Sequence, residues 1–306
     1  MAIEPVEPFR KNRQMMKKLL TIIGICAGLS ASAQGFLGKN TGRVQKTIDT
    51  ASLRCYYLFS KKTEGADKVH RTDTMVLDIG PAVSKFYDPA RLGRDSMLNA
   101  KLASIDPQTI KSVNVYKSDS GRDFSSMPGS TYTGTLEGES YQIIKDKRAQ
   151  KITVLDYIDA IGDRYKYEDE TGALPWKMSN ETDTVAGYTC QKATLSFRGR
   201  EYTAWFAADV PVPDGPWKFW GLPGLILKVE DTQGLFAFRM IGLQQLSASA
   251  PLPIKVDDSR SIKCTRAEFE QQKKKQTGGM LININGGAVV IAQSPRKTGY
   301  LPMETE

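Results

Sequence analysis

Histidine is almost absent from this sequence of 306 residues, in which His70 is the only one. One imidazole cannot supply the ligands of a histidine-rich metal site, so sites of that kind are excluded. The sequence also lacks a Gly-x-Ser-x-Gly elbow, a His-Glu-x-x-His pair and a phosphate-binding glycine loop. His70 lies in a charged segment, where a lone histidine is more often a surface residue than a catalytic base. The sequence therefore indicates no enzyme class, no cofactor and no metal.

Cysteine is scarce as well, with four in the chain. Cys55, Cys190 and Cys264 are far apart and form no Cys-x-x-Cys pair, so neither zinc binding nor thioredoxin chemistry is indicated. In an oxidising compartment two of them can pair and leave the third free. The alternative is that all three are small buried residues, and the spacing does not decide between these two.

A hydrophobic run long enough to span a membrane is also missing. The candidate, Leu19–Leu29, is too short to cross about 30 Å of hydrocarbon. It follows the basic segment Arg10–Lys18 and precedes Ser30–Ala33, and these three parts together predict a secretory signal peptide. We expect cleavage after Ala33, which leaves a periplasmic or secreted protein without a stable membrane anchor.

The positive charge is not arranged for nucleic acid. The formal net charge is +8, and the expected signal peptide accounts for part of it. No cluster of lysine and arginine is interleaved with aromatic residues, so we expect no nucleic-acid partner. The run Lys273–Lys275 ends a helix-like stretch, and we interpret it as a solvated helix end favoured by the helix dipole.

Strand-like segments dominate what the chain does contain. They are rich in β-branched and aromatic residues and partly alternate between apolar and polar positions: Ala51–Ser60, Thr72–Ile79, Val83–Tyr87, Ile110–Tyr116, Ser140–Lys145, Lys151–Tyr157, Thr184–Gly199, Glu201–Ala208, Leu225–Glu230 and Leu235–Gln244. Many strands without regularly interposed helices favour an antiparallel sheet.

Two helices are expected among these strands. Asp88–Ala103 begins with an N-cap aspartate, and Thr265–Gln276 begins with a capping box of Thr265 and Glu268. We expect one mainly β domain, residues 34–306, because no linker or repeat divides the chain.

The acidic side chains suggest two weaker alternatives. Asp156, Asp159 and Asp163 lie close enough in sequence for a calcium site, but they do not fit an EF-hand loop and are better interpreted as solvated acids. Glu168–Glu170 offers carboxylates for acid–base work, but no positioned partner is evident. We interpret it as a polar loop before a turn at Gly172.

The most distinctive stretch is Gly215–Asp231, GPWKFWGLPGLILKVED. Its glycines do not have phosphate-binding spacing. Leu222–Leu225 predicts a type II turn in which Gly224 takes the positive φ, and Leu225–Val229 predicts a core strand.

The rings of this stretch have two interpretations. If the chain is extended here, Trp217 and Phe219 point to one side and Trp220 to the other. The rings then either plug the end of a curved sheet or, with Trp205, line a mouth that binds a lipophilic or peptide ligand. The candidate ligand-binding residues are Trp205, Trp217, Phe219 and Trp220.

A family resemblance is carried by the six residues Gly221, Leu222, Pro223, Gly224, Leu225 and Ile226. They resemble the signature of the GLPGLI family, also called Porph_ging, whose members are secreted proteins of uncharacterised function from Bacteroidetes-type bacteria. The flanking segments Gly187–Ala193, Gly199–Phe206 and Arg71–Gly80 also resemble the family pattern. The likeness covers much of residues 50–245 and is strongest over 180–231.

The resemblance implies a fold but no activity. It implies a strongly curved antiparallel sheet, an incomplete barrel like that of LolA-like carriers, with one or two helices. Such sheets shelter a lipophilic cavity in lipoprotein carriers, but a fold does not determine a function.

Three functions remain open at this point. The first is an exported, non-catalytic binding or accessory protein that holds a lipophilic or peptide ligand on the concave sheet face. The second is a partner or scaffold protein of an outer-membrane transport system. The third is a hydrolase of unknown substrate that uses His70 or dispersed acids.

Overall fold

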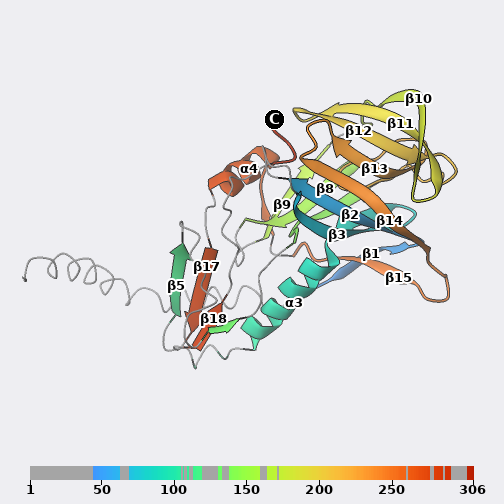
Figure 1. The fold of residues 1–306 in the computed structure, drawn as a ribbon. Coiled ribbons are helices and arrows are strands. Elements are labelled where there is room, and N and C mark those ends of the chain that lie inside the picture. The colour runs from blue at the N-terminus through green and yellow to red at the C-terminus, as the bar shows by residue number, and fades with distance from the viewer. Residues whose placement is uncertain are drawn as a thin grey trace, which may run out of the picture.

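The computed structural model describes residues 44–62, 69–104, 106, 109, 113–118, 130–132, 138–158, 164–170, 172–259, 261–275, 279–284, 287–290 and 302–306. The expected signal peptide lies outside these residues. Within them the protein is mainly β, with two helices and one dominant sheet that curves around a central core (Figure 1). The predicted fold class is confirmed.

Twelve strands form the dominant sheet. Their order across the sheet is β10 (Lys177–Val185), β11 (Tyr188–Phe197), β12 (Arg200–Ala207), β13 (Leu225–Asp231), β14 (Phe236–Gln245), β2 (Leu53–Lys62), β3 (Val69–Ile79), β4 (Val83–Tyr87), β7 (Gln142–Asp146), β8 (Lys151–Tyr157), β9 (Arg164–Asp169) and β16 (Ile262–Lys263). All neighbours pair antiparallel except β16, which runs parallel to β9. The edge strands β10 and β16 do not pair, so the sheet is not closed.

Two smaller sheets accompany it. One pairs β1 (Lys46–Ala51) with β15 (Leu252–Val256). The other has the order β5 (Val113–Ser118), β17 (Gly279–Ile284), β18 (Gly287–Val290) and β6 (Ser130–Tyr132).

Both helices begin as the sequence predicts. The first, α3 (Pro89–Ala103), is capped by Asp88, whose carboxylate accepts the backbone N–H of Arg91 at 2.9 Å. The second, α4 (Arg266–Lys275), has a complete capping box. The Glu268 carboxylate accepts the Thr265 N–H at 2.8 Å, and the Thr265 hydroxyl accepts the Glu268 N–H at 3.2 Å.

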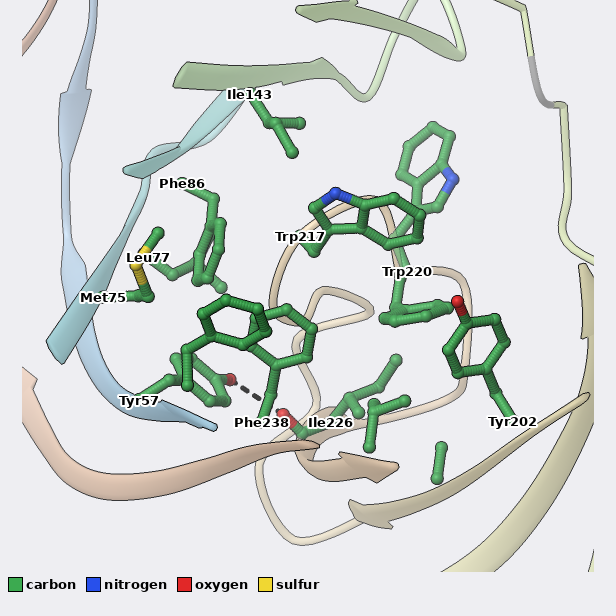
Figure 2. Close-up of a cluster of buried hydrophobic side chains, with 14 of the residues drawn as sticks. Tyr57, Met75, Leu77, Phe86, Ile143, Tyr202, Trp217, Trp220, Ile226 and Phe238 are labelled. Atoms are coloured by element: carbon green, nitrogen blue, oxygen red, sulfur yellow. Dashed lines mark hydrogen bonds between the residues drawn. The ribbon is translucent and has the colours of Figure 1, made fainter. Parts of the chain in front are cut away.

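The core lies on the inner face of the curved sheet. Along β2, burial alternates, so that Cys55, Tyr57 and Phe59 point inward. Figure 2 shows how Tyr57, Phe86 and Phe238 from three different strands meet at the centre of this core. The Phe86 and Phe238 rings are 5.8 Å apart in an edge-to-face contact, a favourable geometry for aromatic pairs.

Two further findings concern the cysteines and the helices. Cys55, Cys190 and Cys264 are free thiols in this structure, two of them buried and Cys264 partly so. Neither helix of the described chain combines the length and apolar character that a membrane crossing requires.

Candidate functional site

The loop that leads into the signature segment is buried at its centre. Residues 208–224 connect β12 to β13 without forming a helix or a strand, and every residue from Asp214 to Trp220 is buried. Loops usually run over the surface because buried backbone N–H and C=O groups need partners. This connection must therefore obtain its hydrogen bonds from the protein interior.

Lys145 on β7 supplies two of those bonds. Its ammonium donates to the carbonyl oxygens of Gly215 and Phe219 and pairs with the carboxylate of Asp214. The Lys145 and Asp214 side chains are fully buried. Burial lowers the pKa of Lys145, and the nearby Asp214 opposes that shift. A second donor, the Trp176 indole N–H, bonds the Trp220 carbonyl at 2.8 Å. Donors from the protein interior thus hold the loop through its backbone carbonyl groups.

The three rings of the loop are built into the protein's own core. Trp217, Phe219 and Trp220 are all buried and belong to the main hydrophobic cluster. The Phe219 ring packs edge-to-face on Tyr202 at 4.7 Å between ring centroids. Figure 2 shows Trp217 and Trp220 on the inner side of the sheet, together with Tyr202 from β12. Trp205, also on β12, is partly buried and packs against the same cluster.

The backbone at Trp217 explains why the extended arrangement does not occur. Trp217 has φ of 52°, in the left-handed region that bulky residues rarely adopt. The chain turns there instead of running straight, so the two-residue spacing does not divide the rings between two faces. A ligand contact by these four aromatic residues stays a prediction.

The predicted type II turn at Leu222–Leu225 is wrong. The glycine with positive φ is Gly221, at 89°, and not Gly224. Gly224 is required for another reason. A Cβ added there would lie 2.1 Å from the backbone oxygen of Ala207 at the end of β12. The loop closes against its own starting strand, and only a residue without a side chain fits.

Lys218 forms a buried ion cluster between the loop and the sheet. Its ammonium lies 2.9 Å from the Asp169 carboxylate and 2.8 Å from both carboxylate oxygens of Glu304. Arg198 also pairs with Asp169 and lies 3.9 Å from Glu304. Burial raises the pKa of Asp169, but Lys218 and Arg198 outweigh it, and the net shift is downward. Lys218 and Arg198 thus face the two carboxylates directly, and Arg266 also contributes to lowering the pKa of Asp169.

Glu304 belongs to a C-terminal segment, Pro302–Glu306, that docks beside the loop; we call it the tail segment. The carbonyls of Pro302 and Met303 accept hydrogen bonds from Arg200 at 3.0 Å and from the Tyr202 hydroxyl at 2.8 Å. Further along, the Thr305 N–H donates to the Arg198 carbonyl at 2.9 Å, and Arg266 on α4 donates to the Glu306 carbonyl. The residues that hold the tail segment, which we call the tail groove, are Arg198, Arg200, Tyr202, Lys218 and Arg266.

A tight turn brings the tail groove against the tail segment. Arg198 and Gly199 link β11 to β12 and both have positive φ, 52° and 76°, as a two-residue type I′ hairpin requires. A Cβ at Gly199 would lie 2.0 Å from the Thr305 hydroxyl. Arginine is not a preferred residue at this φ, so the turn accepts strain at the position that binds Asp169 and Thr305.

Several acidic and basic predictions need correction. Glu168–Glu170 is not a loop, because β9 extends to Asp169, whose carboxylate is buried in the Lys218 cluster. Asp156 is not solvated; it is buried and bonds both the Ser140 hydroxyl and Lys273. Lys273 is therefore not a solvated helix end, although its two neighbours on α4 are exposed.

The other candidate groups are placed only in part. Asp159 and Asp163 lie outside the described residues. His70 lies on β3, and its side chain is outside what the structure describes. Among the described residues, no group of three or more histidines, cysteines, aspartates or glutamates is arranged to hold a metal ion.

The family comparison matches this site directly. The family model described as "Protein of unknown function (Porph_ging)" matches residues 198–228. The Porph_ging signature is present. The matched segment begins at Arg198 and includes Arg200, Tyr202 and Lys218, so the Porph_ging segment contributes four of the five residues of the tail groove.

Comparison with curated proteins gave no match. Among solved structures, PNGF-II in the P21 space group is similar, with a TM-score of 0.46 and 13% identity over 74% of this chain and 34% of that chain. PNGF-II in the C2 space group gives 0.45 and 14%, over 74% and 33%. This chain spans about a third of the length of those structures, and likeness at this level says nothing about what it does.

Sequence reasoning missed the ion cluster. Lys218 stands between two aromatic residues in a segment that is otherwise apolar, and a charge in such a place must be exposed or paired. The sequence therefore contains a signal that Lys218 needs an anionic partner or an exposed position. Its partner Glu304 is 86 residues away, and no sequence pattern connects the two.

Proposed function

We propose that this chain is an exported accessory protein of the cell envelope that binds a partner through a short linear peptide and catalyses no reaction. The observation that supports the proposal is the tail segment itself, which is held by five hydrogen-bonded positions in a row, Pro302 to Glu306. The groove thus contacts both backbone and side-chain groups of a peptide, as peptide-recognition sites do.

A peptide is favoured over a lipophilic ligand. A lipid carrier needs free apolar space on the concave face, and here the buried loop places Trp217, Phe219 and Trp220 among the strands' own side chains. The contacts at the tail groove are polar and directional instead. Such contacts select sequence and register in a peptide but offer little to an acyl chain.

The Porph_ging match supports the same proposal. The matched segment, residues 198–228, contains both the loop with the buried centre and four of the five residues of the tail groove. A rigid loop fastened by Lys145 and Asp214 would hold Lys218 in a fixed position, and preorganised groups bind with less entropy loss. The loop in the matched segment would then serve to position Lys218 in the groove.

The test uses the mature full-length chain with Glu304→Lys, which places a third cation beside Lys218 and Arg198 and should expel the tail segment. A library of displayed linear peptides is selected on this variant and on the unchanged chain. We expect enrichment on Glu304→Lys that is lost when Tyr202→Phe and Arg200→Gln are added. Failure to enrich any peptide on a variant with a native circular dichroism spectrum would overturn the proposal.

A further inference from the structure

We infer that the tail groove contains a pocket selective for a carboxylate side chain, and that the partner it binds presents an Asp or Glu there. This inference rests on the proposed function and adds the chemistry of the partner. In the structure the pocket is occupied by Glu304, so the tail segment is the internal competitor of that partner.

The pocket is built from charges that are fixed before a carboxylate arrives. Lys218 is 1% exposed, and its ammonium is oriented by Asp169 at 2.9 Å. The ammonium also lies over the rings of Tyr167 and Trp217, at 5.2 and 5.4 Å from their centroids. These contacts fix the Lys218 side chain, which is otherwise highly flexible, in one conformation.

The charge balance of the pocket requires an anion. Lys218 and Arg198 carry two positive charges, and Asp169 supplies one negative charge. Without Glu304 or a replacement, the buried Lys218 and the partly exposed Arg198 would share the single carboxylate of Asp169, and a buried cation that loses a partner is destabilising. A neutral glutamine in the same place satisfies geometry but not charge.

The backbone contacts set the register of the peptide without reading its sequence. Tyr202 and Arg200 bind carbonyl oxygens, and the Arg198 carbonyl accepts an N–H. Any residue provides these groups. Gly199 leaves no room for a Cβ beneath Thr305, so the turn packs closely on the peptide just after the acidic residue. The groove can therefore distinguish one peptide sequence from another only at the pocket that binds the acidic side chain.

The experiment measures binding of two labelled peptides by fluorescence anisotropy. One has the tail sequence Leu-Pro-Met-Glu-Thr-Glu, and the other replaces its first Glu with Gln. Both are titrated onto the full-length Glu304→Lys variant. We expect the Glu peptide to bind at least tenfold more tightly than the Gln peptide. We also expect it to bind the unchanged chain at least tenfold more weakly, because the attached tail acts at an effective concentration near millimolar.

Two further variants separate the pocket from the rest of the groove. Adding Lys218→Met should remove the difference between the peptides, whereas adding Tyr202→Phe should weaken both equally. If Glu304→Lys does not fold, Thr305→Pro removes the N–H donated to Arg198 and vacates the groove without a charge. If Lys218→Met does not fold, Arg198→Gln should reduce the difference between the peptides instead.

The outcomes are distinguishable. Equal binding of the Glu and Gln peptides overturns the carboxylate pocket and leaves a peptide-binding protein in place. Binding of neither peptide, together with no enrichment from the displayed library, overturns the proposed function as well. A tenfold difference that persists in Lys218→Met also overturns the assignment of the pocket to Lys218.

Discussion

The Lys218 ammonium lies 2.8 Å from both carboxylate oxygens of Glu304, although the two residues are 86 positions apart, and both are buried. This ion pair joins the loop between β12 and β13 to the tail segment. Buried ion pairs contribute little relative to apolar replacements, but removing one partner is costly because the other charge stays buried.

Glu304→Gln should therefore destabilise the fold. It keeps the shape of the side chain, removes its charge and leaves Lys218 with Asp169 alone, and we expect a loss of about 1–3 kcal/mol in the free energy of unfolding. The measurement is the urea midpoint at unchanged slope. Glu306→Gln is the control, because that side chain is exposed, and it should shift the midpoint little. Equal midpoints for the two variants would contradict the prediction.

Gly199→Ala should release the tail segment. Its Cβ would meet the Thr305 hydroxyl, in addition to the cost of an alanine at positive φ. Gly187→Ala is the matched control, because Gly187 occupies the same place in the β10–β11 hairpin, with φ of 84° and open space around it. Hydrogen exchange of the Thr305 amide should accelerate in Gly199→Ala only. Adding Thr305→Gly should restore protection at position 305, and a failure to do so would argue against the clash.

Gly224→Ala should be among the most damaging single substitutions in the loop. The new methyl group would overlap the Ala207 carbonyl, which is backbone and cannot rotate away, so we expect a loss of more than about 3 kcal/mol or failure to fold. Gly93→Ala is the control. Gly93 lies within α3 with nothing near its Cβ position, and alanine there should be neutral or stabilising by up to about 1 kcal/mol. Similar melting temperatures for both variants would refute the close approach.

The sequence predicts the strands whose burial alternates or whose residues are mostly apolar. Val83–Tyr87 is found at its predicted bounds, and Leu225–Val229 is a core strand. The first part of β10, before Thr184, was missed because its residues are polar and mostly exposed, so the sequence has no apolar period there. The pairing of β1 with β15 joins segments about 200 residues apart, and such long-range contacts leave no local signal.

Of the five residues of the tail groove, only Lys218 lies in the stretch that the sequence singles out. The aromatic loop and the family signature both direct attention to residues 215–226. The ion cluster around Lys218 depends on Asp169 and Glu304, which the sequence places in separate segments. The type II turn was wrong because the need for glycine at position 224 arises from Ala207, across the loop. Rules based on the local sequence cannot account for a residue that comes close only when the chain folds.

Tyr57→Phe tests a buried hydrogen bond to β13, the strand that follows the loop. The Tyr57 hydroxyl is fully buried and donates to the Ile226 carbonyl at 2.8 Å, a bond drawn in Figure 2. Removing it leaves that carbonyl without this donor, and we expect a loss of about 1–3 kcal/mol. The adjacent Tyr56 hydroxyl makes an exposed bond of 3.3 Å to Gln244, so Tyr56→Phe should cost less than about 0.5 kcal/mol. Chemical denaturation of both variants measures the difference, and equal losses would show that the buried bond adds nothing.

Lys85 should make stability depend on pH in the alkaline range. Its side chain is 6% exposed and donates to the Lys255 carbonyl at 2.7 Å. Burial lowers its pKa to about 8 from 10.5, although Asp78 opposes the shift. Between these two values the unfolded chain binds the proton and the folded chain releases it. The contribution of Lys85 to stability therefore rises with pH from about 8 to 10.5 and is constant below pH 8.

The variant Lys85→Met lacks this titration, and the other titrating groups cancel when the two proteins are compared. The stability of the unchanged chain relative to Lys85→Met should therefore increase between pH 8 and 10.5, by at most about 3 kcal/mol from the size of the shift. Urea unfolding followed by circular dichroism at pH 7, 8, 9 and 10 gives this difference directly. A difference that stays constant across the four pH values would mean that Lys85 keeps an ordinary pKa, and a difference that decreases would mean that its charged form is the one the fold favours.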